Sequence, residues 1–120
     1  IPNNYKNKIV LYGCGGDRDI TKRPKIAKTV SKYSSLQLIT DDNPRNENPK
    51  SIRDILLLNS KNAISIANRE KAIKYGVKLI KKKSGILIVA GKGHENTQTI
   101  KNKINKFSDQ LIIKKYAKNI

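Results

Sequence analysis

Cysteine, histidine, methionine and tryptophan are almost absent from this sequence. Its 120 residues include one cysteine, one histidine and neither of the other two. With Cys14 as the only thiol, no disulfide can form within the chain, and a reducing cytoplasm is the expected location. No apolar run approaches the roughly 20 residues that cross a bilayer, and the basic N-terminus is not followed by the apolar run of a signal peptide. We therefore expect a cytoplasmic protein with no membrane partner.

Acidic and aromatic residues are also few. Nine Asp and Glu stand against 26 Lys and Arg, so the net charge is +17. Such an excess favours non-specific binding to nucleic-acid phosphates. The lysines are nevertheless scattered, with one tight cluster at Lys81–Lys83, and five Tyr and one Phe form no repeat on which bases would stack. No specific nucleic-acid partner is expected, and a basic α/β binding module or gene remnant with non-specific nucleic-acid affinity is the alternative function.

Short apolar runs alternate with helical patterns along the chain. The runs predict strands over residues 8–12, 36–40, 63–67 and 86–90, with a hairpin within 97–107. Helices are predicted after the N-caps Thr21, Asn68 and Ser108, and another opens at Pro49. This alternation predicts an α/β fold with a doubly wound, mostly parallel sheet, followed by a C-terminal hairpin and helix. The apolar run 86–90 is typical of a strand covered on both faces.

Helical spacing also predicts which side chains face the sheet. The inward residues expected from it are Ile26, Ala27, Val30 and Tyr33 in the first helix, Ile52 and Ile55 to Leu58 in the second, Ala72, Ile73, Val77 and Ile80 in the third, and Leu111, Ile112 and Tyr116 in the last.

Polar loops close three of the predicted strands: Gly13 to Asp19, Asp41 to Arg45, and Gly91 to Glu95. In an open α/β sheet, ligands bind beyond the carboxyl ends of the strands, so these loops are expected to meet at one edge. The glycine loop has neither the Walker spacing nor the dinucleotide fingerprint, and a tight turn explains it equally well. Arg23, at the start of the next helix, either binds an anion bidentately or is a solvated surface charge.

The third loop allows the same two kinds of interpretation. Its lone His94 is more often a structural hydrogen-bonding residue than a catalyst. Glu95 either holds a ligand ammonium or caps the following segment.

Four stretches taken together carry a resemblance that none carries singly. They are Gly13-Cys14-Gly15-Gly16-Asp17-Arg18-Asp19, Lys22-Arg23-Pro24, Thr40-Asp41-Asp42-Asn43-Pro44-Arg45, and Val89-Ala90-Gly91-Lys92-Gly93-His94-Glu95. In this order and spacing they closely resemble the C-terminal domain of the Mur ligases. Within that family they are most similar to the branch that adds meso-diaminopimelate as the third residue of the peptidoglycan stem peptide. The resemblance implies a Rossmann-like fold.

The resemblance also implies roles for individual residues. Around meso-diaminopimelate it places Arg23, Asp42, Asn43, Arg45, Gly91 and Glu95. Arg45 would discriminate diaminopimelate from lysine, because only diaminopimelate has a distal carboxylate for a guanidinium fork. Glu95 and the Gly91 carbonyl would take the distal ammonium, and Asp17 would lie on the nucleotide side, at the ribose hydroxyls.

The family's UDP-sugar-binding domain, its Gly-Lys-Thr phosphate loop and its magnesium-binding residues are not in this sequence. Residues 1–120 are therefore expected to form one C-terminal domain that is incomplete at its N-terminus, since the chain starts at Ile1 without the opening strand and helix of the family's domain. The resemblance implies ATP, Mg²⁺ and the UDP-N-acetylmuramoyl dipeptide for the full-length enzyme, bound through upstream domains. For this chain alone we expect a monomer with no catalytic residue, no bound cofactor and no ligase activity.

Overall fold

The computed structural model describes residues 7–16, 20–83, 85–90, 97–100, 103–106 and 109–117. The elements, in chain order, are β1 (Lys8–Tyr12), α1 (Lys22–Tyr33), β2 (Leu36–Ile39), α2 (Pro49–Leu58), β3 (Ala63–Ser65), α3 (Arg69–Lys83), β4 (Ile86–Val89), β5 (Thr97–Ile100), β6 (Lys103–Lys106) and α4 (Asp109–Ala117). Each strand and helix expected from the sequence is present. The third strand ends two residues earlier than predicted. Ser108, the predicted N-cap of the last helix, lies outside the described residues.

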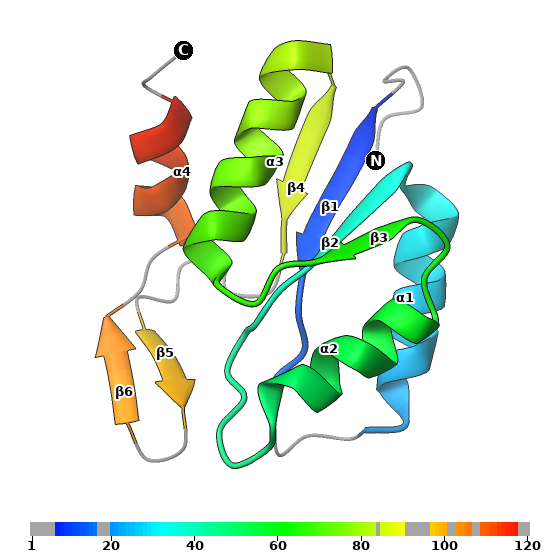
Figure 1. The fold of residues 1–120 in the computed structure, drawn as a ribbon, viewed down its shortest axis with the longest axis vertical. Coiled ribbons are helices and arrows are strands. Elements are labelled where there is room, and N and C mark those ends of the chain that lie inside the picture. The colour runs from blue at the N-terminus through cyan, green and yellow to red at the C-terminus, as the bar shows by residue number, and fades with distance from the viewer. Residues whose placement is uncertain are drawn as a thin grey trace.

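The main sheet has four parallel strands in the order β3-β2-β1-β4. Strand β1 is therefore central, pairing with β2 on one side and β4 on the other. The antiparallel hairpin β5–β6 forms a separate two-stranded sheet (Figure 1). All four carboxyl ends of the main sheet point the same way, which gives the edge where the sequence predicts a site.

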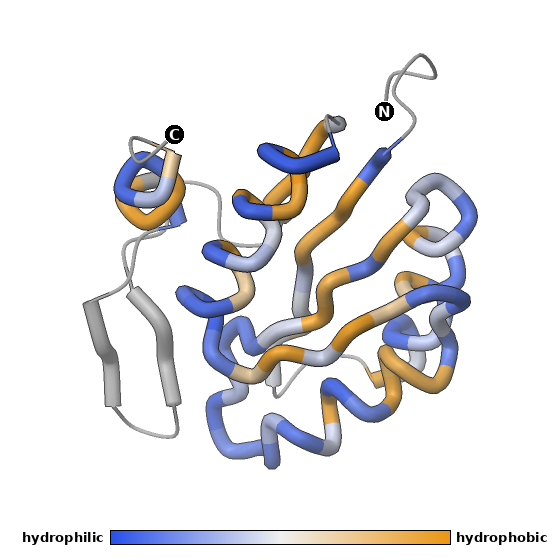
Figure 2. Tube along the Cα trace, turned by 45° about the horizontal axis from the view of Figure 1, so that its top comes forward, coloured by the Kyte–Doolittle hydropathy of each residue, from blue (hydrophilic) through white to orange (hydrophobic). Residues whose placement is uncertain are grey.

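Helices cover both faces of this sheet, so the alternating side chains of β1 enter two different cores. Ile9 and Leu11 pack with α3 and with apolar residues of α4, whereas Val10 and Tyr12 pack with α1 and α2. Figure 2 shows that the strands are largely hydrophobic, whereas the helices carry both hydrophobic and hydrophilic residues. The arrangement confirms a doubly wound α/β fold.

Asparagine side chains cap the N-termini of two helices. Asn48 Oδ1 accepts from the Lys50 and Ser51 backbone N–H groups at the start of α2, and Asn68 Oδ1 accepts from Lys71 N in α3. Both satisfy N–H groups that have no partner within the helix. Thr21 precedes α1 as predicted, but its side chain makes no capping hydrogen bond.

The predicted inward faces of three helices need correction. In α1 the side chains of Ile26 and Tyr33 are exposed, and the buried residues are Arg23, Ala27 and Ser31. Leu57 and Leu58 at the end of α2 are exposed, and so is Leu111 in α4. The physical reason in α1 is that polar partners bury its polar residues: Ser31 Oγ donates to Gln37 Oε1 of β2 (3.2 Å), and Arg23 is paired as described below.

Strand β4 is covered from both faces but is only half-buried. Leu87 and Val89 pack on one core, and Ile88 and Ala90 on the other. All four residues of the strand have intermediate exposure because β4 is the edge strand next to β1. The strand is therefore packed on both faces, as its continuous apolar run predicts, but it is not fully buried. None of the described helices is long and apolar enough to cross a membrane.

Candidate functional site

The glycine loop and the Asp-Asn-Pro-Arg loop lie against each other at the carboxyl edge. The Gly16 N–H donates to the Asn43 carbonyl at 2.6 Å. A Cβ added to Gly16 would overlap the carbonyl oxygen of Pro44, and one added to Gly13 would overlap that of Thr40. Glycine is needed at both positions because two backbones approach more closely than any side chain permits.

Arg45 sits at the end of this contact in an unusual backbone conformation. Its φ of 50° is the one positive value among the described non-glycine residues. The guanidinium Nη1 donates to the carbonyls of Gly16 (3.0 Å) and Asn43 (3.3 Å). Left-handed backbone in an arginine is costly and is found where surrounding contacts hold it, commonly at ligand sites. The two loops and Arg45 therefore form one locked unit.

Arg23 is buried beneath the same unit, with 3% of its surface exposed. Its Nη1 and Nη2 atoms bind the two carboxylate oxygens of Glu47 at 3.0 and 2.8 Å, and Nη2 also donates to the Gly15 carbonyl at 2.9 Å. The hydrogen bonds to Glu47 raise the pKa of Arg23 further above its usual value. Arg23 is thus the internal support of the glycine loop, and it is not a solvated surface charge.

Asp41 and Cys14 at this edge also have altered pKa values. Burial raises the pKa of the Asp41 carboxyl, although the ion pair with Arg53 of α2 acts in the opposite direction. Burial also raises the pKa of the Cys14 thiol, and the nearby Arg23 partly offsets this. A thiol with a raised pKa is mostly protonated at neutral pH and is a poor nucleophile, consistent with Cys14 packing against the core shared by α1 and α2.

The sequence profile of the family described as Mur ligase, glutamate ligase domain, matches residues 2–93 of this chain. The chain belongs to the Mur ligase family. Within the family it is the C-terminal domain, and this confirms the resemblance read from the four sequence stretches.

Individual relatives of this Mur ligase domain agree with the profile. It is 50% identical over 115 residues to the UDP-N-acetylmuramoyl-L-alanyl-D-glutamate–2,6-diaminopimelate ligase of Buchnera aphidicola subsp. Baizongia pistaciae, covering 93% of this chain and 22% of that protein. The ligase with the same name from Anaplasma marginale is 42% identical over 107 residues, covering 89% and 23%. A solved structure of a ligase with this name superposes with a TM-score of 0.87 at 30% identity, covering 95% of this chain and 24% of the other. The chain therefore spans less than a quarter of the length of these relatives.

The structure brings together four of the residues predicted for the amino-acid pocket of the Mur ligase domain. Arg23, Asp42, Asn43 and Arg45 lie in or directly beneath the paired loops. Gly91, Glu95 and Asp17 lie outside the described residues. The last described residue before Gly91 is Ala90, whose N–H donates to the Leu11 carbonyl at 2.9 Å. Ala90 therefore lies beside β1, the strand that leads into the glycine loop.

Three charged residues of the site were missed by reasoning from the sequence. Glu47 forms an ion pair with Arg23, and Arg53 forms one with Asp41. Arg69 donates to the carbonyls of Asp41 and Ala90, the residues that directly precede the second and third loops. Glu47 could have been found, because it stands in the prolonged loop after Arg45 and is the nearest following acid. Nothing local marks Arg69, whose carboxylate partner Asp109 is 40 residues away.

The described residues of this Mur ligase domain contain neither a metal-binding cluster nor a phosphate loop. Among these residues no group of three His, Cys, Asp or Glu side chains can hold a metal ion. The one described glycine turn has no phosphate-loop lysine, and its Gly16 N–H is already given to Asn43. Nothing here supports a nucleotide phosphate site on these residues, and the role of Asp17 stays a prediction.

Proposed function

We propose that this domain is the amino-acid-binding part of an ATP-dependent ligase that joins meso-diaminopimelate to UDP-N-acetylmuramoyl-L-alanyl-D-glutamate. The observation that carries the proposal is the locked unit of the glycine and Asp-Asn-Pro-Arg loops, with Arg45 fixed at its end. The names of the relatives support it, since they specify a diaminopimelate ligase. The proposal includes the cytoplasmic location and the monomeric state expected from the sequence.

The side chains suit the chemistry of this substrate. Diaminopimelate carries an ammonium and a carboxylate at each end, and one amine must react while the other end is held. A guanidinium has five N–H donors in a planar fork, and the two described bonds of Arg45 use Nη1. In the proposed pocket, Arg45 and Asn43 take the distal carboxylate, and Asp42, Glu95 and the Gly91 carbonyl face the ammonium.

Arg23 contributes to the proposed pocket in a more specific way. Both of its Nη atoms are bound to Glu47 and Gly15. The Glu47 carboxylate therefore occupies the Nη1–Nη2 edge of the guanidinium, and a substrate carboxylate could bind that edge only in place of Glu47. Without that exchange, Arg23 acts by holding the glycine loop against Asn43.

The experiment is an NMR titration of this chain with meso-diaminopimelate, with L-lysine as the ligand control. Diaminopimelate should shift the amide signals of Asn43, Arg45, Gly91 and Glu95, and lysine should not. In R45K the charge remains but the fork is lost, so affinity should fall about 10- to 100-fold, the equivalent of one charge-assisted hydrogen-bond pair of roughly 1.5–3 kcal/mol. K50A is the matched control, because Lys50 pairs with Asp54 on the exposed side of α2 and should leave affinity unchanged. A well-folded chain that is silent at millimolar diaminopimelate would refute the pocket as an autonomous unit.

We propose further that this chain alone does not catalyse ligation, since the phosphate loop and magnesium residues of the family are not in its sequence. ATP, Mg²⁺ and the UDP-linked dipeptide would be bound by upstream domains. Phosphate release from ATP with all substrates present should stay at the background rate. A turnover above background that R45K abolishes would overturn this part of the proposal.

A further inference from the structure

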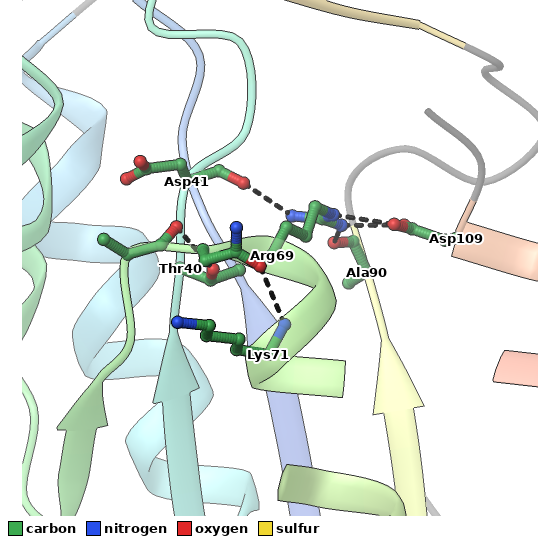
Figure 3. A network of polar contacts seen from close by, with 8 residues as sticks. Thr40, Asp41, Arg69, Lys71, Ala90 and Asp109 are labelled. Atoms are coloured by element: carbon green, nitrogen blue, oxygen red, sulfur yellow. Dashed lines mark hydrogen bonds and ion pairs between the residues drawn. The ribbon is translucent and has the colours of Figure 1, made fainter. Parts of the chain in front are cut away.

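Arg69, the first residue of α3, makes four hydrogen bonds from a side chain that is wholly buried. Its Nε and Nη2 bind the two oxygens of Asp109 at 2.7 and 2.8 Å. Nη1 donates to the Asp41 carbonyl at 3.2 Å, and Nη2 donates to the Ala90 carbonyl at 3.0 Å. Figure 3 shows the guanidinium between these three partners, which come from three different segments of the chain.

The two backbone partners are the residues that introduce the two halves of the proposed pocket. Asp41 directly precedes Asp42 and its loop, and Ala90 directly precedes Gly91. They follow β2 and β4, which are not hydrogen-bonded to each other because β1 lies between them. The sheet ladder links these two loop starts only indirectly, through β1: the Thr40 N–H donates to the Tyr12 carbonyl and the Ala90 N–H to the Leu11 carbonyl. The Arg69 guanidinium links the two loop starts directly.

The backbone N–H, the backbone carbonyl and the carboxylate of Asp41 each have a partner. Its N–H donates to the Ala67 carbonyl at 3.3 Å, its carbonyl accepts from Arg69, and its carboxylate pairs with Arg53. Such a residue has little freedom to move relative to the sheet. A shift of the Arg69 guanidinium would change its hydrogen bonds to the Asp41 and Ala90 carbonyls, which directly precede the two loops.

The position of Arg69 is in turn set by α4. A buried guanidinium requires a paired carboxylate, and Asp109, with 4% of its side chain exposed, supplies it. Helix α4 is fastened to α3 by further bonds: the Tyr116 hydroxyl donates to Glu70 at 2.7 Å, and Lys81 Nζ donates to the Tyr116 carbonyl at 3.2 Å. The C-terminal helix is thus connected to both loop starts through one side chain.

We propose that Arg69 and Asp109 are positioning residues that set the spacing of the two pocket loops, so that α4 controls diaminopimelate affinity without touching the ligand. The inference rests on the proposed function for its ligand, but the coupling of the loops to α4 is measurable without one. The four described hydrogen bonds of Arg69 join Asp109 to the Asp41 and Ala90 carbonyls, and the proposed action of both residues runs through those two carbonyls.

The test compares D109N, which removes the charge at constant shape, with D54N as the matched control. Asp54 forms an exposed pair with Lys50 in α2, so D54N makes the same chemical change away from the network. In the ligand-free chain, D109N should shift the amide signals of both 42–45 and 91–95, whereas D54N should shift neither. Diaminopimelate affinity should fall about 10- to 100-fold in D109N, the loss expected when binding groups are misplaced by about an ångström.

The outcomes separate the two proposals. A folded D109N whose two loops keep their signals, or whose changes stay within α4, overturns the positioning role even if its stability is reduced. A D109N chain with both loops shifted and unchanged diaminopimelate affinity overturns the link to binding. If D109N does not fold, D109E, which keeps the charge and lengthens the side chain, is judged by the same signals. A wild-type chain that does not bind diaminopimelate refutes the proposed function, and the ligand-free loop signals still decide the positioning role.

Discussion

Replacing Gly16 by alanine tests whether the two site loops pack as described. The added Cβ would overlap the Pro44 carbonyl oxygen and lie 2.5 Å from the Pro44 carbonyl carbon. Both atoms are backbone, so the clash cannot be relieved by turning a side chain. To relieve the clash, the two loops would have to move apart. That movement would lengthen the 2.6 Å hydrogen bond from Gly16 N to the Asn43 carbonyl and displace the Gly16 carbonyl that accepts from Arg45.

The size of the effect follows from two opposing contributions. Overpacking by one methyl group costs roughly 1–3 kcal/mol, whereas Gly-to-Ala replacement restricts the unfolded chain and returns about 0.4–1 kcal/mol. The net loss in the free energy of unfolding should be about 1–2 kcal/mol. For a chain of this length, that lowers Tm by roughly 3–10 °C.

Gly76 of α3 provides the matched control. A Cβ there would meet the methyl groups of Leu87 at 3.0 and 3.1 Å and of Leu38 at 3.2 Å, all ends of flexible side chains. The helix gains up to about 1 kcal/mol from alanine, so G76A should change stability by no more than about 1 kcal/mol. Urea unfolding and amide spectra should show G16A destabilised with shifted signals at 43–45, and G76A near wild type there. A G16A chain as stable as the wild type, with unchanged signals at 43–45, would refute the described packing.

Two further predictions concern charge. The Tyr116 hydroxyl and Lys115 hold the pKa of Glu70 below its usual value. A carboxylate with a lowered pKa in the folded state stabilises the fold fully at pH values above the unfolded-state pKa of about 4.3. This stabilisation is lost as the pH falls through the lower folded-state pKa. The stability difference between wild type and E70Q in urea unfolding should therefore be constant from pH 5 to 7 and shrink below about pH 4; a difference independent of pH would contradict this. With a net charge of +17, raising the salt from about 10 mM to 150 mM should raise Tm by screening self-repulsion and should abolish binding to a labelled single-stranded oligonucleotide. Binding that survives 150 mM salt would favour the alternative of a nucleic-acid-binding module.

The strands could be predicted because the signal for each is local. A run such as Ile86 to Val89 is apolar whatever the rest of the chain does, and the loops that follow such runs meet by the geometry of a parallel sheet. This is why the Asp-Asn-Pro-Arg loop and the glycine loop were expected at one edge, and they do meet there.

The support of the site could not be predicted in the same way. Arg23 and Arg69 are buried only because Glu47 and Asp109 come from 24 and 40 residues away to pair with them. An isolated sequence window shows each arginine as a surface charge, and hydropathy then assigns the inward face of α1 to Ile26 and Tyr33, which are in fact exposed. Burial of a charge depends on a partner, and the partner is set by the fold.

The central place of β1 has a consequence for the order in which the chain can fold during synthesis. Its Leu11 pairs with Leu38 on one side but must wait for Val89 on the other. At about 5–20 residues per second, a ribosome delivers that second partner several seconds after the first strand has emerged. Strand β1 can close onto β2 early, yet its other side stays unpaired until β4 has been made. The nascent intermediate therefore exposes the edge of a strand that is innermost in the finished sheet, where another chain could pair with it.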